Sequence, residues 1–395
     1  MAAPAGRLSH IALHAGSGQP LARALQRRFG FRPAAVREAG GWHQLALRSG
    51  RAVFVVTEGA GGAGPGPLYD LAPARGLPTA SNACFEVADV RAAVRALRAL
   101  GCAVAVEPRA VADAGGAVRY AVVRSPVGDL SHTLLERGAY RGPFLPGFRA
   151  CGPGAPAGDP RDAAGPGDWF SHVDHLALAC PRGRAAAWLR WYQRCLGFRP
   201  LRLGPSGPGL DVRAGRAGGL RLCALRPPAG SAAPMLVLSE SLSGPRGPGR
   251  PGRPAPDQIE RFLARHGPGL QHAALYAPDI LAAARRVARA PGGLVAPPAA
   301  YYRRPGRAAQ MLAAGQEPGR LAELGILLDG EARRGRAAYL LQAFARPLFS
   351  EDTFFLELIQ RQGATGFGQG NVRALWEALE EHAAAAGPGG AEPPA

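Results

Sequence analysis

The chain has 395 residues, 47% of them hydrophobic and 19% charged, which allows two or more globular domains with full cores. The formal net charge is +18, but all 47 Lys or Arg positions hold Arg and no aromatic-interleaved basic stripe occurs, so we expect no nucleic-acid partner. No apolar run reaches the roughly 18 to 20 residues of a membrane span, so no transmembrane segment is expected.

The N-terminal segment has a charge bias. Six Arg and no acidic residue precede Glu38, a composition typical of a mitochondrial targeting segment. Residues 8–14 are nevertheless predicted to form the first strand, so any targeting signal overlaps the fold. We expect a mitochondrial location, with a cytoplasmic location as the alternative.

The six cysteines form no CxxC pair and no Cys/His zinc spacing. With no secretory signal peptide before them, they are expected to be reduced and mostly buried thiols.

Two long segments of the chain share one pattern. Residues 8–33 and residues 173–200 each predict a strand with a His near its start, then a helix, then Gly-Phe-Arg-Pro. This match places His10 and His175 at equivalent positions.

A second pair of matching segments follows, one in each half. Residues 82–101 and residues 272–291 each predict a short strand, an Asp that caps a helix, and an amphipathic helix. Asn82 therefore stands where His272 stands. The capping residues are Asp89 and Asp279.

A third match closes each half, because residues 131–137 correspond to residues 355–361 and Thr133 corresponds to Glu357. Glu357 lies within an apolar strand, and burying an unpaired carboxylate costs several kcal/mol. The side chain therefore needs a cation, a metal ion or a strong donor beside it. For Glu357 alone, an Arg partner is the simplest explanation.

Apolar segments between these anchors predict further strands. They lie at residues 44–47, 52–57, 120–123, 220–225, 235–238, 340–344 and 353–359. The predicted fold is α+β, with four β-α-β-β-β modules paired into two domains. The modules span about residues 7–58, 80–137, 171–240 and 270–361.

The domain boundaries follow from composition. We expect an N-terminal domain at residues 7–137, a Gly/Pro/Asp-rich linker at 149–168 and a C-terminal domain at 169–382. Residues 383–395 form an Ala/Gly/Pro tail that is expected to be disordered, and residues 241–256 form an Arg/Gly/Pro insert that is expected to be a solvated loop.

The equivalent strand positions differ in chemistry between the halves. The C-terminal half carries His175, His272 and Glu357, and two imidazoles with one carboxylate form the facial triad of non-haem Fe(II) sites, which leaves three coordination positions open. The N-terminal half keeps one potential ligand, His10, so no metal is expected there. Each His alone is more often a satisfied core residue, but all three at equivalent positions favour one Fe(II) per chain.

The C-terminal half resembles 4-hydroxyphenylpyruvate dioxygenase, a vicinal-oxygen-chelate enzyme. The matching segments are VDHLAL at 173–178, GLQHAALYAPDI at 269–280, PPAAYY at 297–302, YLLQAFARP at 339–347 and FFLELIQRQGATGFGQGN at 354–371. The N-terminal half matches more loosely, including GPFLPGF at 142–148. The resemblance implies two vicinal-oxygen-chelate (glyoxalase-like) domains, with iron held by His175, His272 and Glu357 in the C-terminal barrel.

The resemblance also implies residues that line a substrate pocket. These residues are Gln258, Gln271, Gln342, Phe344 and Phe367. The segment between Gln258 and His272 is one residue shorter than in the family, and Asn371 opens a C-terminal helix that would gate the site.

Three departures from the family fall in the pocket. Met235 replaces a serine, Val372 replaces a phenylalanine, and the insert at 241–256 replaces a loop with Pro and Asn. Because the metal ligands are kept while the pocket wall is changed, we expect altered regiochemistry or an altered substrate.

The resemblance implies an Fe(II)- and O₂-dependent oxygenase of an aromatic 2-oxo acid. The altered pocket favours conversion of 4-hydroxyphenylpyruvate to 4-hydroxymandelate, for use in making the ubiquinone head group. The alternatives are a dioxygenase that forms homogentisate and a non-catalytic binding or scaffold protein. The expected partners are the 2-oxo acid, O₂ and a second copy of the chain in a homodimer.

Overall fold

The computed structural model describes residues 4–59, 66–152, 167–203, 209–214, 218–242, 257–333 and 336–372. The predicted tail, almost all of the predicted insert and most of the predicted linker lie outside these residues. Within the described helices, no segment combines the length and the apolar character needed to cross a membrane.

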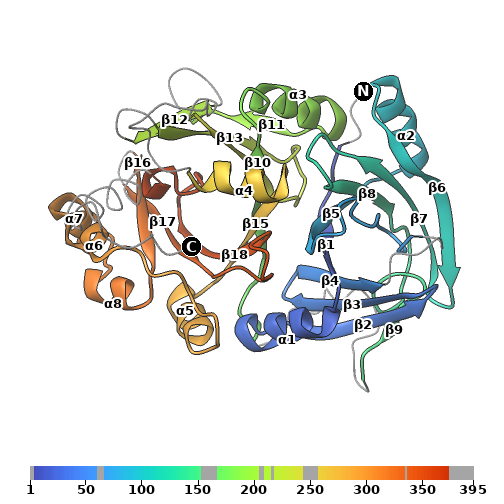
Figure 1. Cartoon of the computed structure of the whole chain (residues 1–395), viewed down its shortest axis with the longest axis horizontal. Helices are drawn as coiled ribbons and strands as arrows, with labels where there is room; N and C mark the ends of the chain where they lie inside the picture. Colours follow the sequence, from blue (N-terminus) through green and yellow to red (C-terminus); the bar gives the residue numbers. More distant parts are fainter. Residues whose placement is uncertain are drawn as a thin grey trace.

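The strands form two curled sheets that lie side by side (Figure 1). The strand order in the first sheet is β6-β7-β8-β5-β1-β4-β3-β2-β9. Its strands are β1 Leu8–Ala15, β2 Arg32–Ala39, β3 Trp42–Ser49, β4 Ala52–Gly59, β5 Thr79–Glu86, β6 Val104–Asp113, β7 Gly116–Arg124, β8 Ser131–Glu136 and β9 Arg149–Ala150. Two helices belong to this half, α1 Gly18–Phe29 and α2 Val90–Ala99.

The second sheet has the order β11-β13-β14-β10-β15-β18-β17-β16, and β12 pairs with β13. Its strands are β10 His172–Cys180, β11 Arg199–Leu201, β12 Gly209–Ala214, β13 Gly218–Arg226, β14 Met235–Ser241, β15 Gly269–Tyr276, β16 Leu327–Arg333, β17 Arg336–Phe344 and β18 Phe355–Gln362. Its helices are α3 Ala185–Leu196, α4 Gln258–His266, α5 Ile280–Ala288, α6 Ala299–Arg303, α7 Pro305–Ala313 and α8 Pro318–Glu323.

The repeat predicted from the sequence is present in the strand pairing. In each sheet the two modules meet at a central antiparallel pair, β1 with β5 and β10 with β15. The registers correspond, since Ala12 lies opposite Asn82 and Ala177 lies opposite His272. This confirms the α+β fold of paired β-α-β-β-β modules. The fourth module also contains α6, α7 and α8, which the sequence pattern did not predict.

The predicted helix ends and caps have clear physical causes. The helices α1 and α3 end at Gly30 and Gly197, whose φ angles of 65° and 73° lie in the left-handed region that glycine adopts at little cost. Asp89 and Asp279 each accept a hydrogen bond from a backbone N–H three residues further on, so both cap their helices as predicted.

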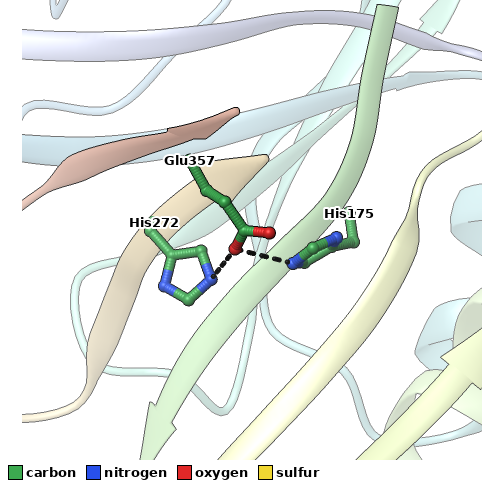
Figure 2. A group of neighbouring side chains, drawn as sticks. All are labelled: His175, His272 and Glu357. Carbon is green, nitrogen blue, oxygen red and sulfur yellow. Dashed lines mark ion pairs between the residues drawn. The ribbon is translucent and has the colours of Figure 1, made fainter. Parts of the chain in front are cut away.

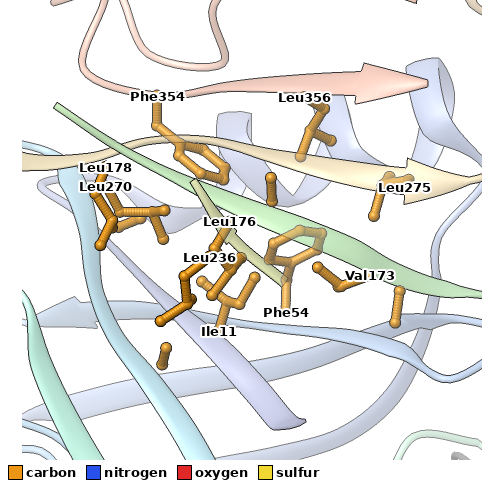
Figure 3. Close-up of a cluster of buried hydrophobic side chains, with 14 of the residues drawn as sticks. Ile11, Phe54, Val173, Leu176, Leu178, Leu236, Leu270, Leu275, Phe354 and Leu356 are labelled. Carbon is orange, nitrogen blue, oxygen red and sulfur yellow. The ribbon is translucent and has the colours of Figure 1, made fainter. Parts of the chain in front are cut away.

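The two sheets share one hydrophobic core, which Figure 3 shows in part. In β10, Leu176 and Leu178 point into this core, where side chains from the first half such as Phe54 meet side chains from the second half such as Phe354, with ring centroids 6.3 Å apart. Because side chains alternate along a strand, His175 lies on the opposite face of the sheet. The shared core therefore fixes which residues of β10 face the candidate site.

Two sequence expectations need correction. Arg149 and Ala150, placed in the linker, form the edge strand β9, where Ala150 lies opposite Ala35 of β2. The last strand was expected from residue 353 but begins at Phe355, where its pairing with His272 of β15 starts, and the hydroxyl of Thr353 donates to the Pro78 carbonyl, 2.5 Å away in the first half.

Candidate metal centre

Three side chains converge on neighbouring strands of the second sheet (Figure 2). The Nε2 atoms of His175 and His272 each lie 3.4 Å from Oε2 of Glu357. One ligand atom from each of the three residues lies within 4.8 Å of the others. The side chains of His175 and Glu357 are 2% exposed and that of His272 is 14% exposed, so access to the cluster is on the His272 side.

The register of the strands explains this convergence. Ala274 of β15 lies directly opposite His175 of β10 on one side and Glu357 of β18 on the other. His272 is two residues before Ala274 and therefore projects from the same face of the sheet. The small side chain of Ala274 leaves room between the three larger ones.

Asp174 and Arg361 support His175 from behind. The register of β10 shifts between Val173 and His175, so Asp174 occupies a bulge and its carboxylate Oδ1 accepts a hydrogen bond from His175 Nδ1 at 2.9 Å. Arg361 donates to both carboxylate oxygens of Asp174, at 2.7 and 2.6 Å. A carboxylate on Nδ1 fixes the ring orientation and directs Nε2 toward Glu357.

The charges in the cluster depend on one another. Burial disfavours the charged form of His175, but Glu357 and Asp174 outweigh this and raise its pKa to about 9. Burial alone would raise the pKa of Glu357, whereas the two imidazoles hold it below its ordinary value. Burial lowers the pKa of His272, and its Nδ1 has no hydrogen-bond partner among the described residues. The two carboxylates, Asp174 and Glu357, thus favour a positive charge in the space between the two Nε2 atoms and Glu357.

The donor set fits a non-haem iron site. Two imidazole nitrogens and one carboxylate oxygen are borderline and hard ligands that suit Fe(II), and the three side chains project from the same face of the second sheet. The unpaired Nδ1 of His272 leaves that imidazole free to present its Nε2 lone pair to a metal.

A chain of hydrogen bonds holds the second oxygen of Glu357. Gln342 Nε2 donates to Oε1 of Glu357 at 2.7 Å and to the Phe367 carbonyl at 2.9 Å. The Oε1 atom of Gln342 accepts from Asn371 Nδ2 at 2.8 Å, and Asn371 Oδ1 accepts from the Tyr301 hydroxyl at 2.8 Å. Because Gln342 holds Oε1, the free oxygen Oε2 is the one that faces the imidazoles.

The predicted pocket residues differ in how close they lie to the three converging side chains. Gln271 is buried and occupies a second bulge, between the residues of β15 that pair with β10. Phe344 lies opposite Glu357, and its ring is 6.3 Å from that of Phe355, which stacks on His272 at 4.7 Å. Gln258 is exposed in the first turn of α4, and none of the described contacts joins it to the three converging residues. Substrate contact by these residues stays a prediction.

The hydrogen bonds of Gln342 also bear on its expected role as a substrate-binding residue. Both ends of its amide are used by protein partners, so in this structure it positions Glu357. Asn371 lies in a helical stretch at residues 369–372, and the rest of the predicted gating helix lies outside the described residues.

The equivalent positions in the first half are packed in another way. His10 lies against Phe144, with ring centroids 5.4 Å apart. Asn82 donates to Thr133 Oγ1 at 3.0 Å, and the Thr133 hydroxyl donates to the Tyr69 carbonyl at 2.7 Å. The polar groups of Asn82 and Thr133 thus satisfy each other, and among the described residues no group of three potential metal ligands includes His10. That this half holds no metal stays a prediction.

Sequence reasoning missed Asp174 and Arg361. Asp174 directly precedes a predicted ligand, so a carboxylate next to a ligand histidine was the available signal. Its partner Arg361 is 187 residues away, and no local pattern connects the two.

We expect Asp174→Asn to weaken Fe(II) binding by about tenfold, since outer partners of ligand histidines contribute roughly 10- to 100-fold to metal affinity. The asparagine oxygen can still accept from His175, but the charge that favours a cation and the Arg361 ion pair are lost. Competition with a chromogenic chelator measures the affinity. Asp211→Asn is the matched control, because it removes the carboxylate of the Asp211–Arg221 ion pair, a 2.8 Å contact far from the cluster in the sheet. Equal affinities in both variants and the unmodified protein would contradict a positioning role for Asp174.

The fold and the site together define a class of protein. Residues 172–314, which include His175 and His272, match the model of the Glyoxalase/Bleomycin resistance protein/Dioxygenase superfamily. A solved structure of a triple mutant of 4-hydroxymandelate synthase from Streptomyces coelicolor has the same fold, with a TM-score of 0.73 and 24% identity over 96% of this chain and 99% of that one. The protein thus has the vicinal-oxygen-chelate fold and carries a potential His-His-Glu metal site.

Relatives with higher identity identify the family within this class. The chain is 57% identical to the human 4-hydroxyphenylpyruvate dioxygenase-like protein over 97% of this chain and 99% of that protein. It is 30% identical to 4-hydroxyphenylpyruvate dioxygenase of Caenorhabditis elegans over 76% of this chain and 71% of that enzyme. The chain belongs to the 4-hydroxyphenylpyruvate dioxygenase-like family.

Proposed function

We propose that this protein is an Fe(II)- and O₂-dependent oxygenase of an aromatic 2-oxo acid, with one iron per chain. The observation that carries the proposal is the convergence of His175 Nε2, His272 Nε2 and Glu357 Oε2 on one face of the second sheet. Two imidazoles and one carboxylate are the donor set of non-haem Fe(II) oxygenases, and together they would hold the iron while leaving room for substrate and O₂.

The surrounding residues prepare the ligands for this role. Asp174 accepts the Nδ1 proton of His175, so Nε2 would be the nitrogen that holds the metal, with its own proton displaced. Gln342 holds Oε1 of Glu357, so Oε2 would be the oxygen that holds the metal. Bound Fe(II) supplies the redox and Lewis-acid chemistry that joins O₂ to the 2-oxo acid with loss of CO₂. The protein's contribution is to fix the geometry and to exclude water from a buried cluster.

We further propose that the product is 4-hydroxymandelate formed from 4-hydroxyphenylpyruvate. Met235 of β14 lies directly opposite His175 in the parallel pairing of β10 with β14, so its side chain projects from the same face beside a proposed ligand. A thioether at this point, where the resemblance places a serine, changes the wall against which the aromatic ring rests. A displacement of about 1 Å is enough to change which carbon is attacked.

The atoms balance for either product. One oxygen of O₂ enters the new carboxylate, the other enters a hydroxyl, and the original carboxyl carbon leaves as CO₂. Hydroxylation at the benzylic carbon yields 4-hydroxymandelate, whereas hydroxylation of the ring with migration of the side chain yields homogentisate. The two products are isomers, so a mass alone does not distinguish them.

The test is a defined reaction of the full chain. The metal-free protein is loaded with Fe(II) without oxygen, 4-hydroxyphenylpyruvate and O₂ are added, and products are separated by chromatography against standards of both isomers. We expect a 4-hydroxymandelate peak with matching O₂ uptake. Homogentisate would establish the dioxygenase alternative, and an absence of bound iron would favour a non-catalytic binding or scaffold protein.

We also propose a mitochondrial location, where the product would supply the ubiquinone head group. The Arg-rich segment before Glu38 supports this proposal. It overlaps β1, which is buried in the centre of the first sheet, so cleavage beyond residue 8 would remove a core strand. We expect the mature protein isolated from mitochondria to retain residues 8–15 at its N-terminus, as read by intact-mass measurement. Exclusion from isolated mitochondria would contradict this location.

A further inference from the structure

Two cysteines from different halves of the chain lie in contact. Cys102 follows α2 in the first half, Cys195 lies in α3 of the second half, and their Sγ atoms are 3.2 Å apart although 93 residues separate them. Both thiols are free. In Figure 1 the helices α2 and α3 lie near each other beside the N-terminus.

This contact belongs to a wider interface between the halves. His132 of β8 makes a hydrogen bond of 3.1 Å with the Tyr192 hydroxyl of α3, and its ring stacks on Trp191 with centroids 6.0 Å apart. Cys195 is buried in the shared core and Cys102 packs against the edge of that core. The surrounding contacts therefore hold the two sulfurs together.

We propose that Cys102 and Cys195 form a redox modification site, in which oxidation joins the two halves of the chain by a disulfide. A disulfide needs an S–S distance of about 2.05 Å, so the sulfurs must approach by about 1.2 Å. The side chain of Cys102 is partly exposed, so a small oxidant reaches it, whereas Cys195 is buried and reacts only through Cys102.

The pKa values of the two thiols differ in the direction that lets Cys102 react before Cys195. The hydrogen bond from Cys195 lowers the pKa of Cys102 to about 7, with smaller contributions from Trp191 and Arg194. The same contact, together with burial, raises the pKa of Cys195. Cys102 is thus the thiolate that attacks first, since the thiolate is the reactive form.

The oxidant that we name is a small disulfide such as oxidised glutathione. The Cys102 thiolate attacks one sulfur of that disulfide, which forms a mixed disulfide and releases one small thiol. Cys195 then attacks the Cys102 sulfur, its proton passes to the leaving thiolate, and a second small thiol is released. In balance, two protein thiols and one small disulfide give one protein disulfide and two small thiols.

The experiment incubates the full chain with oxidised glutathione and maps the peptides without reduction. We expect a linked peptide pair that contains Cys102 and Cys195, with a mass roughly 2 Da below the sum of the two reduced peptides. Cys195→Ala is expected to trap glutathione on Cys102, whereas Cys102→Ala is expected to leave Cys195 unmodified. Cys151→Ala is the control, because burial raises the pKa of that partly exposed thiol, and the linked pair must still form.

The unmodified chain gives the decisive result even if a variant fails to fold. Glutathione that stays on Cys102 without formation of the linked pair would overturn the proposal, as would modification of the other cysteines at the same rate. The linked protein is also expected to melt at a higher temperature than the reduced protein, since the cross-link restricts the unfolded chain.

Discussion

His272→Ala is expected to abolish stoichiometric iron binding and all O₂-dependent product. The substitution removes one of three converging ligand atoms and leaves His175 and Glu357 as two donors, too few to hold Fe(II) with three open positions. We expect iron affinity to fall by at least about 100-fold, because losing a ligand costs more than losing its outer partner. Elemental analysis after gel filtration measures the iron, and an oxygen electrode measures turnover.

The first half of the chain offers a matched control for this variant. His10→Ala deletes an imidazole from the equivalent strand position, where the ring packs against Phe144 and is not part of the converging cluster. Iron content and product are expected to match the unmodified protein, with folding checked by circular dichroism. One full equivalent of iron in His272→Ala would refute the assignment of the metal centre. Loss of iron in a correctly folded His10→Ala variant would indicate that the metal binds in the first half of the chain and not at the proposed site.

Met235→Ser is expected to shift the product from 4-hydroxymandelate toward homogentisate. Met235 lies opposite His175 in the register of β10 and β14, so its side chain borders the space beside the proposed iron. Replacing the thioether by a hydroxyl enlarges that space and adds a polar group, which allows the aromatic ring to move. A change of about tenfold in the product ratio corresponds to about 1.4 kcal/mol between the two transition states, which is within the range of such packing changes.

The control for this prediction is Met235→Leu, which keeps an apolar side chain of similar volume. We expect it to retain the product ratio of the unmodified protein, as measured by chromatography against both standards. If Met235→Ser leaves the ratio unchanged while total turnover persists, then Met235 does not set the regiochemistry. A shift of equal size in Met235→Leu would mean that loss of the thioether side chain, and not added space or polarity, changes the outcome.

The two halves use one backbone frame for different purposes. In the first half, Asn82 donates a hydrogen bond to Thr133, and a separate cluster of buried hydrophobic side chains forms within this half. In the second half, the equivalent positions hold His272 and Glu357, and Oε2 of Glu357 points at the imidazoles of His272 and His175. The fold therefore supports a metal site without requiring one, and the chemistry depends on the side chains at three strand positions.

Local sequence patterns were sufficient for much of this architecture. Strand and helix periodicity, the glycines at positions 30 and 197, and the caps at Asp89 and Asp279 depend on neighbouring residues, so they are visible in the sequence. The internal repeat added long-range information, because aligning the two halves predicted that His175, His272 and Glu357 occupy comparable strand positions.

Other features depended on how the strands and halves assemble. Arg361 reaches Asp174 because β18 and β10 lie on either side of β15, and a sheet order of that kind cannot be read from either segment. The engagement of Gln342 with Glu357 required the register of β17 on β18. A residue can be assigned to a pocket from resemblance, but its hydrogen-bond partners are decided by that register.

The sequence by itself determined the class of fold and the three converging residues, because both follow from periodicity and internal repetition. The tertiary structure alone decided that Asp174 orients His175, that Gln342 supports Glu357, and that Cys102 meets Cys195. The physical reason is that Asp174 is held by Arg361 of another strand, Gln342 and Glu357 lie on different strands, and Cys102 and Cys195 come from opposite halves. The relative positions of these elements depend on the packing of the whole core.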